Sequence, residues 1–110
     1  MRVLARRGED EAAARLAAGV AAYALKVTVE DVIESPRGSA DVAFARRVAM
    51  YLCHIGFELS LARVAAAFGR DRSTVAYACH AIEDRREDGR FDAWISRLER
   101  MVRVAPPVRR

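Results

Sequence analysis

The 110-residue sequence has only two cysteines, 7% aromatic residues and no long hydrophobic run. Cys53 and Cys79 are each followed directly by a histidine, which does not match the C-x2-C or H-x3-H spacing of zinc ligands. We therefore expect two buried, reduced thiols and no bound metal. No apolar stretch approaches the ~20 residues of a membrane span, and the charged N-terminus lacks the hydrophobic segment of a secretory signal. These absences predict a cytoplasmic protein with no membrane partner.

The sequence also lacks the motifs of common enzyme sites. It contains no glycine-rich phosphate loop, no H-E-x-x-H metalloprotease motif and no G-x-S-x-G nucleophile motif. We therefore expect no enzymatic activity, no cofactor and no small-molecule substrate.

Alanine and arginine are the residues that are abundant instead. Hydrophobic residues make up 53% and charged residues 31%, which is typical of a soluble globular protein, and the length suits one domain. The formal net charge is +4, and Lys26 is the only lysine. Arginine binds phosphates and guanine edges well, but a GC-rich genome produces the same composition. Composition alone leaves both interpretations open.

Apolar residues recur at helical spacing along the whole chain, which predicts an all-α bundle of six helices without a sheet. We expect a flexible N-terminal tail over residues 1–8, a single helical domain over 9–104 and a short basic C-terminal tail over 105–110. A loop with proline and glycine is expected over 35–41. The expected helices cover residues 9–25, 29–34, 42–55, 61–68, 73–86 and 92–103.

Capping residues and apolar stripes support these boundaries. Thr28 and Ser60 can cap the helices that follow them, and Gly56 suits a helix C-terminus. The inner stripe of the first helix is expected to contain Leu16, Val20, Tyr23 and Ala24. One side of the last helix carries Trp94, Leu98, Met101 and Val102, either as core or as a surface for a partner.

Residues 61–86 have the pattern of a helix-turn-helix. Such a unit needs a small residue in the first helix, glycine at the turn and apolar residues on the facing sides of both helices. Ala65 is the small residue and Gly69 occupies the turn. The facing apolar residues are Val64 and Phe68 before the turn, and Val75 and Ala78 after it.

Polar residues crowd the start of the second helix of this unit. If Val75 faces inward, the polar residues beside it project outward, where a major groove is read. Arginine can pair with guanine, aspartate can accept from cytosine, and threonine can contact a thymine methyl group. An ordinary helical hairpin with solvated charges remains the alternative. The candidate DNA-binding residues here are Arg70, Asp71, Arg72, Ser73, Thr74 and Tyr77.

Three stretches resemble the C-terminal DNA-binding domain of the bacterial replication initiator DnaA. Residues 45–52 (ARRVAMYL) and 60–69 are similar to two helices of that family, and residues 69–79 (GRDRSTVAYAC) resemble its signature G-R-D-H-[ST]-T-V-x-x-A-C. The resemblance covers roughly residues 20–87. It implies a helical bundle related to the Trp repressor, which places the motif helix in the major groove of double-stranded DNA and a basic loop in the minor groove. It further implies phosphate contacts by Arg37, Arg46 and Arg47.

The sequence also departs from the family pattern. Arg72 stands where the family usually has histidine, the turn is one glycine shorter, and Ala40, Asp41 and Phe44 replace residues of an arginine-rich loop. We therefore expect a DNA site different from the initiator's, and whether the depleted loop enters the minor groove stays open. The ATPase part of the initiator lies outside these 110 residues, so we expect a stand-alone protein.

These features predict a sequence-specific double-stranded DNA-binding protein of the nucleoid, acting as a transcriptional regulator. Short proteins of this type resemble phage-derived regulators and activators of gene-transfer-agent clusters, which act with partner proteins at the polymerase. One alternative is a degenerate interaction protein that binds a transcription or replication partner. Another is an accessory factor that binds at a replication origin.

Overall fold

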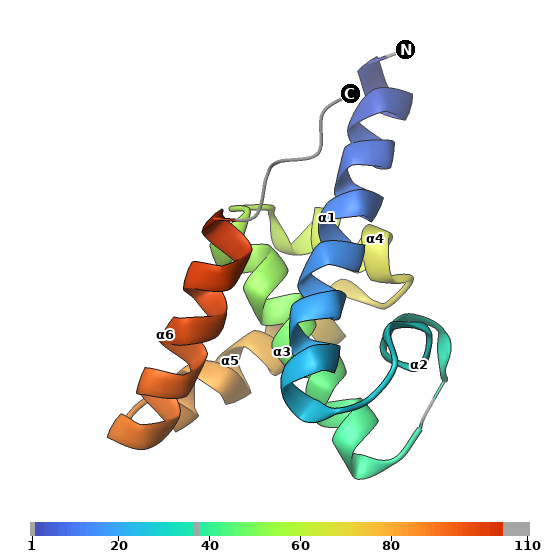
Figure 1. Cartoon of the computed structure of the whole chain (residues 1–110). Helices are drawn as coiled ribbons and strands as arrows, with labels where there is room; N and C mark the ends of the chain where they lie inside the picture. Colours follow the sequence, from blue (N-terminus) through green and yellow to red (C-terminus); the bar gives the residue numbers. More distant parts are fainter. Residues whose placement is uncertain (1, 37, 105–110) are drawn as a thin grey trace.

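The computed structural model describes residues 2–36 and 38–104, which form six helices and no strand (Figure 1). The predicted all-α fold is confirmed for these residues. None of the helices in the described ranges has the length and apolarity that a membrane crossing requires. The expected basic tail over 105–110 lies outside the described residues. The helices are α1 (Arg2–Leu25), α2 (Val29–Glu34), α3 (Ala40–Gly56), α4 (Leu61–Phe68), α5 (Arg72–Arg85) and α6 (Gly89–Val104).

The N-terminal helix begins earlier than its sequence pattern indicated. α1 begins at Arg2 rather than near Glu9, so residues 2–8, expected to form a flexible tail, are helical. The helix continues through Gly8, because a single glycine costs a helix only about 1 kcal/mol. The N-terminal end of α1 extends beyond the other helices (Figure 1). Asp10 joins this part of α1 to α4 through a two-bond ion pair with Arg63, at 2.7 and 3.0 Å.

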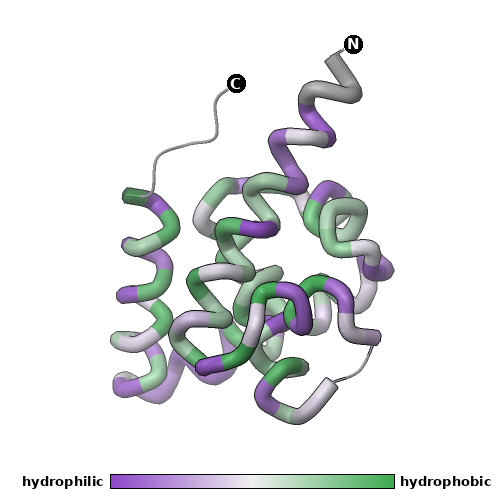
Figure 2. Tube along the Cα trace, turned by 45° about the vertical axis from the view of Figure 1, so that its right-hand side comes forward, coloured by the Kyte–Doolittle hydropathy of each residue, from purple (hydrophilic) through white to green (hydrophobic). Residues whose placement is uncertain are grey.

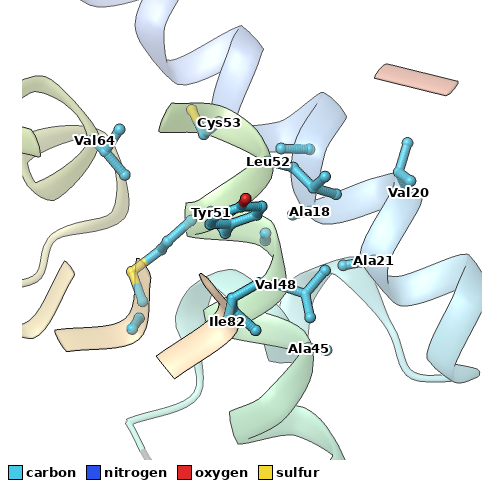
Figure 3. Close-up of a cluster of buried hydrophobic side chains, with 14 of the residues drawn as sticks. Ala18, Val20, Ala21, Ala45, Val48, Tyr51, Leu52, Cys53, Val64 and Ile82 are labelled. Carbon is cyan, nitrogen blue, oxygen red and sulfur yellow. The ribbon is translucent and has the colours of Figure 1, made fainter. Parts of the chain in front are cut away.

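The core is centred on α3, which contacts all five other helices. Large side chains of α3, among them Tyr51 and Leu52, are fully buried, and Leu52 lies beside Ala18 of α1 (Figure 3). The buried face of α1 consists mainly of alanine, which lets the two helices approach closely. Tyr23, expected on that face, is instead 79% exposed, so its prediction as a core residue is wrong. The buried apolar residues of α1 are Ala14, Ala17, Ala18, Val20, Ala21 and Ala22.

Gly56 has a different role from the predicted helix cap. It is the last residue of α3, whose C-cap is Phe57, and the left-handed backbone conformation occurs at Glu58 instead (φ 59°). A Cβ atom at Gly56 would lie 3.0 Å from Cγ1 of Val102. The missing side chain therefore lets α6 approach the end of α3.

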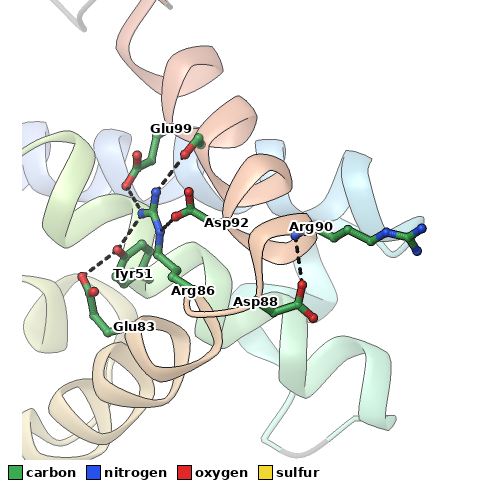
Figure 4. Close-up of polar contacts among 8 residues, drawn as sticks. Tyr51, Glu83, Arg86, Asp88, Arg90, Asp92 and Glu99 are labelled. Carbon is green, nitrogen blue, oxygen red and sulfur yellow. Dashed lines mark hydrogen bonds and ion pairs between the residues drawn. The ribbon is translucent and has the colours of Figure 1, made fainter.

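The side chain of Arg86 joins α6 to the rest of the bundle (Figure 4). Its guanidinium donates to Asp92 (2.6 Å), Ser96 (2.8 Å) and Glu99 (2.9 Å) of α6, and to the Tyr51 hydroxyl of α3 (2.9 Å). Burial, with a hydrogen bond to Glu83, raises the pKa of Tyr51 to about 12.

The sequence predicted the buried face of α6 only in part. Leu98 and Val102 are buried as expected, whereas Trp94 is half-buried and Met101 is 40% exposed. Hydrophilic and hydrophobic residues alternate along α6, so its outer face is polar (Figure 2). The helix also begins at Gly89, three residues before the predicted start at residue 92.

Candidate nucleic-acid interface

The turn between α4 and α5 has the geometry of a tight helix-turn-helix. Ser60 caps α4, accepting a hydrogen bond from the Arg63 backbone N–H (3.2 Å). Gly69 ends α4 in the left-handed conformation (φ 66°, ψ 37°), which glycine adopts without strain. The next residue, Arg70, donates its backbone N–H to the Ala65 carbonyl oxygen (2.9 Å). The predicted roles of Ser60 and Gly69 are confirmed.

The two sides of α5 separate cleanly into core and surface. Val75, Ala78 and Ile82 are at most 1% exposed and pack into the core. Ser73, Thr74 and Tyr77 are exposed, and Tyr77 exposes 71% of its surface. The predicted inward position of Val75 is therefore confirmed, and it directs its neighbour Thr74 toward solvent.

The N-terminus of α5 offers unpaired hydrogen-bond donors. Asp71 occupies the N-cap position, but its side chain makes no capping hydrogen bond. Within residues 2–36 and 38–104, no carboxylate lies within 4.0 Å of the Arg72 guanidinium. First-turn N–H groups and the helix dipole favour an anion such as phosphate at this position.

Sequence analysis missed one exposed residue on this face. His80 follows Tyr77 by one helical turn and is exposed. The inward positions of Val75, Ala78 and Ile82 already place it outward, so the helical period of α5 could have identified it. The exposed polar surface therefore continues along α5, over Arg72, Ser73, Tyr77 and His80.

Arg46 is not available as a phosphate contact, and that prediction is wrong. Its side chain is 8% exposed. Nε donates to the Val32 carbonyl oxygen (2.8 Å), and Nη2 donates to the carbonyl oxygens of Asp31 (3.0 Å) and Ser35 (2.5 Å). Burial and the charge of Arg70 lower the pKa of Arg46. Its role is to hold the C-terminal end of α2 against α3.

Arg70 also contacts the segment after α2. Its Nη2 donates to the Ser35 carbonyl oxygen at 3.0 Å, so this oxygen accepts hydrogen bonds from both Arg70 and Arg46. The half-buried Arg70 therefore holds Ser35, at the C-terminal end of α2, beside the start of α5, whereas Arg72 is exposed. Arg37, a predicted phosphate contact in the 35–39 loop, lies outside the described residues.

Arg47 is more accessible than its neighbour Arg46, as a phosphate contact requires. It is only half-buried, and none of the hydrogen bonds or ion pairs between described residues involves it. The candidate DNA contacts that remain are Arg47, Asp71, Arg72, Ser73, Thr74 and Tyr77. Arg46 and Arg70 instead hold the backbone that supports them.

Comparisons with known proteins connect this geometry to a family. Residues 17–82 match the family described as bacterial DnaA protein helix-turn-helix. The matched region covers more than half of the chain and includes both helices of the unit around Gly69. The polar residues at the start of α5 therefore lie inside it.

The similar curated proteins are chromosomal replication initiators. The chain is 37% identical to DnaA of Rippkaea orientalis over 86 residues, covering 76% of this chain and 19% of that protein. It is 42% identical to DnaA 2 of Chlamydia trachomatis over 66 residues, covering 60% and 14%. It is 51% identical to DnaA of Clavibacter sepedonicus over 59 residues, covering 53% and 12%. The chain thus spans less than a fifth of the length of these relatives.

A crystal structure of a DNA replication initiation factor has a similar fold. The TM-score is 0.79 at 26% sequence identity, and the match covers 92% of this chain and 31% of that chain.

Proposed function

The chain belongs to the bacterial DnaA helix-turn-helix family, and from this membership we propose that it binds double-stranded DNA with α5 in the major groove. The observation that carries the proposal is the exposed polar face at the start of α5, directly opposite a fully buried apolar stripe. The shared buried core of the six helices supports a single DNA-binding domain.

The side chains of this face have complementary roles in the proposed complex. Arg72 pairs with a guanine edge, Ser73 and Thr74 contact phosphate or a thymine methyl group, and Tyr77 lies against the backbone. Asp71 accepts a hydrogen bond from cytosine or orients Arg72. These contacts give sequence preference.

A second group of residues supplies affinity that does not depend on sequence. Arg47, which is half-buried and unpaired within the described residues, binds phosphate, and Arg37 is proposed to do the same from the 35–39 loop. Arg46 and Arg70 act indirectly, because they share the Ser35 carbonyl oxygen as acceptor and so hold the C-terminal end of α2 beside α5.

The proposed biological role is regulation of transcription by a nucleoid-associated protein. A DNA-binding domain needs no catalytic part to place or exclude a polymerase partner. Binding at a replication origin is the second candidate, because the similar proteins are named chromosomal replication initiators.

An interaction protein that no longer binds DNA is the third candidate. The substitutions at Ala40, Asp41 and Phe44, which lie at the start of α3, favour it, because Asp41 is an exposed acid in a position where the resemblance leads us to expect arginine. The exposed arginine and hydroxyl side chains at the start of α5 oppose it.

The decisive experiment is binding of the purified chain to genomic fragments at a stated salt concentration. DNA binding predicts a set of preferred fragments and a loss of affinity as salt is raised, since bound phosphates release counterions. Mapping the preferred fragments on the chromosome separates promoters from an origin. If no fragment binds above random DNA at low salt, sequence-specific binding is excluded.

A further inference from the structure

Three aromatic side chains gather far from the turn between α4 and α5. Phe44 of α3 and Phe91 and Trp94 of α6 form a mutual cluster, with ring centroids 6.4 Å (Phe44–Phe91), 6.2 Å (Phe44–Trp94) and 5.6 Å (Phe91–Trp94) apart. Phe91 is buried, whereas Phe44 and Trp94 keep part of their surface exposed. Phe91 and Trp94 also lie after the region that matches the family.

An arginine lies against this cluster without a carboxylate partner. The guanidinium carbon of Arg85 is 4.2 Å from the centroid of the Phe91 ring and 5.2 Å from that of Phe44. No ion pair within the described ranges involves Arg85, although its neighbour Arg86 has two. Stacking on aromatic rings leaves the N–H groups at the edge of the guanidinium free to bind an anion.

The cluster and Arg85 line an open pocket of about 280 Å³. The other lining residues are Ala24 and Leu25, at the end of α1, so its walls are apolar apart from Arg85 and include no acid. The volume is slightly below the ~300–1,000 Å³ of sites for whole small ligands. It suits one or two side chains of a protein partner, and aromatic residues with arginine are the composition of interface anchor sites.

The charges around the pocket select the kind of partner. Arg90 and Arg97 lie one helical turn before and after Trp94 and are exposed. Exposed acids lie at the same spacing from the cluster, Asp41 before Phe44 and Glu87 and Asp88 before Phe91, so the charge that decides is that of Arg85, the one charged residue among those lining the pocket. A segment with an apolar side chain and flanking carboxylates complements both the apolar walls and Arg85.

We propose that the pocket of Phe44, Arg85, Phe91 and Trp94 docks an acidic peptide segment of a partner protein, with one apolar side chain as its anchor. Double-stranded DNA fits less well, because it has no apolar group to fill the pocket. Arg85 also lies roughly 20 Å along α5 from Arg72, so the partner and DNA bind at separate places.

Trp94 provides a specific probe, because it is the only tryptophan in the chain. The probe ligand is a short fluorescein-labelled synthetic peptide with one leucine flanked by glutamates, titrated into the full chain. Two control peptides replace the glutamates by lysines or the leucine by glycine. We expect saturable anisotropy and a parallel change in Trp94 emission with the acidic leucine peptide, and neither with the controls.

Matched charge reversals test the role of Arg85. Arg85→Glu should weaken peptide binding at least tenfold and leave DNA affinity within about threefold. Arg72→Glu, which changes the net charge equally, should leave peptide binding unchanged and weaken DNA binding. Ala24→Met fills the pocket from α1 and should weaken peptide binding without lowering the unfolding midpoint, which separates blocking from misfolding.

Three outcomes overturn the proposal. One is the absence of saturable binding by the acidic leucine peptide. The second is peptide affinity that is the same in the Arg85→Glu and unchanged proteins. The third is a DNA duplex that competes with the peptide and produces the same change in Trp94 emission, which would assign the pocket to nucleic acid.

Discussion

Replacing Arg72 by alanine tests the assignment of α5 to the major groove most directly. Arg72 is the first residue of α5, is exposed, and has no carboxylate partner within the described residues. Its side chain therefore contributes little to the folded state. We expect Arg72→Ala to leave the free energy of unfolding within about 0.5 kcal/mol of the unchanged protein.

The expected loss in binding follows from a single base contact. A bidentate arginine–guanine pair discriminates against the wrong base by about 1–3 kcal/mol. Cognate affinity should fall roughly tenfold to a hundredfold, since about 1.4 kcal/mol corresponds to a factor of ten. Preference should relax at one or two base pairs, while binding to random DNA changes little.

The assay is fluorescence anisotropy with the preferred fragment, its single-base variants and a random duplex, repeated at several salt concentrations. Arg100→Ala is the matched control, because Arg100 is an exposed arginine of α6 and its loss changes the net charge equally. The control should bind almost as well as the unchanged protein. Near-normal cognate affinity of a folded Arg72→Ala protein, where the unchanged protein binds specifically, would refute the groove assignment of this residue.

The remaining predictions concern phosphate contacts, buried groups and the turn. Arg47→Ala should flatten the log–log salt dependence of DNA binding by about 0.9 without changing site preference; a changed preference with an unchanged slope would contradict the assignment. Arg46→Met removes three hydrogen bonds to carbonyl oxygens, although the Ser35 oxygen keeps its bond from Arg70, and should lower the free energy of unfolding on the order of 3 kcal/mol in urea titrations; a loss below about 0.5 kcal/mol would show that the site relaxes. Gly69→Ala imposes the left-handed conformation on a side chain and should cost about 1–2 kcal/mol, with Gly69→Asn costing less, as thermal unfolding can measure. Burial raises the pKa of Cys53 to about 12 and of Cys79 to about 11, so the folded state keeps protons that unfolded thiols lose above about pH 8.5, and stability should fall from there upward; Cys53→Ala should reduce this fall between pH 8 and 10.

The sequence by itself determined the helices and the turn between α4 and α5, because these depend on local chemistry. The capping hydrogen bonds of Thr28 and Ser60 join residues three positions apart, so they do not depend on distant parts of the chain. Gly69 likewise adopts the left-handed conformation of the turn without contacts to distant residues. The outward positions of Ser73, Thr74 and Tyr77 follow from the helical period once Val75 faces inward. The burial of Cys53 and Cys79 was also predictable from their apolar stripes.

Tertiary structure decided which of the similar residues take part in the site. Arg46 and Arg47 are neighbours of the same type, and only the packing of α2 on α3 shows that one serves three carbonyl oxygens while the other does not. Arg70 and Arg72 also differ in role. Arg70 donates to the carbonyl oxygen of Ser35, which lies 35 positions earlier in the sequence, whereas Arg72 is exposed, and only the folded chain brings Ser35 to Arg70. Tyr23 is exposed rather than in the core, since α3 approaches α1 closely enough to admit alanine and exclude a large ring. Such assignments depend on contacts between distant parts of the chain, and no local spacing encodes them.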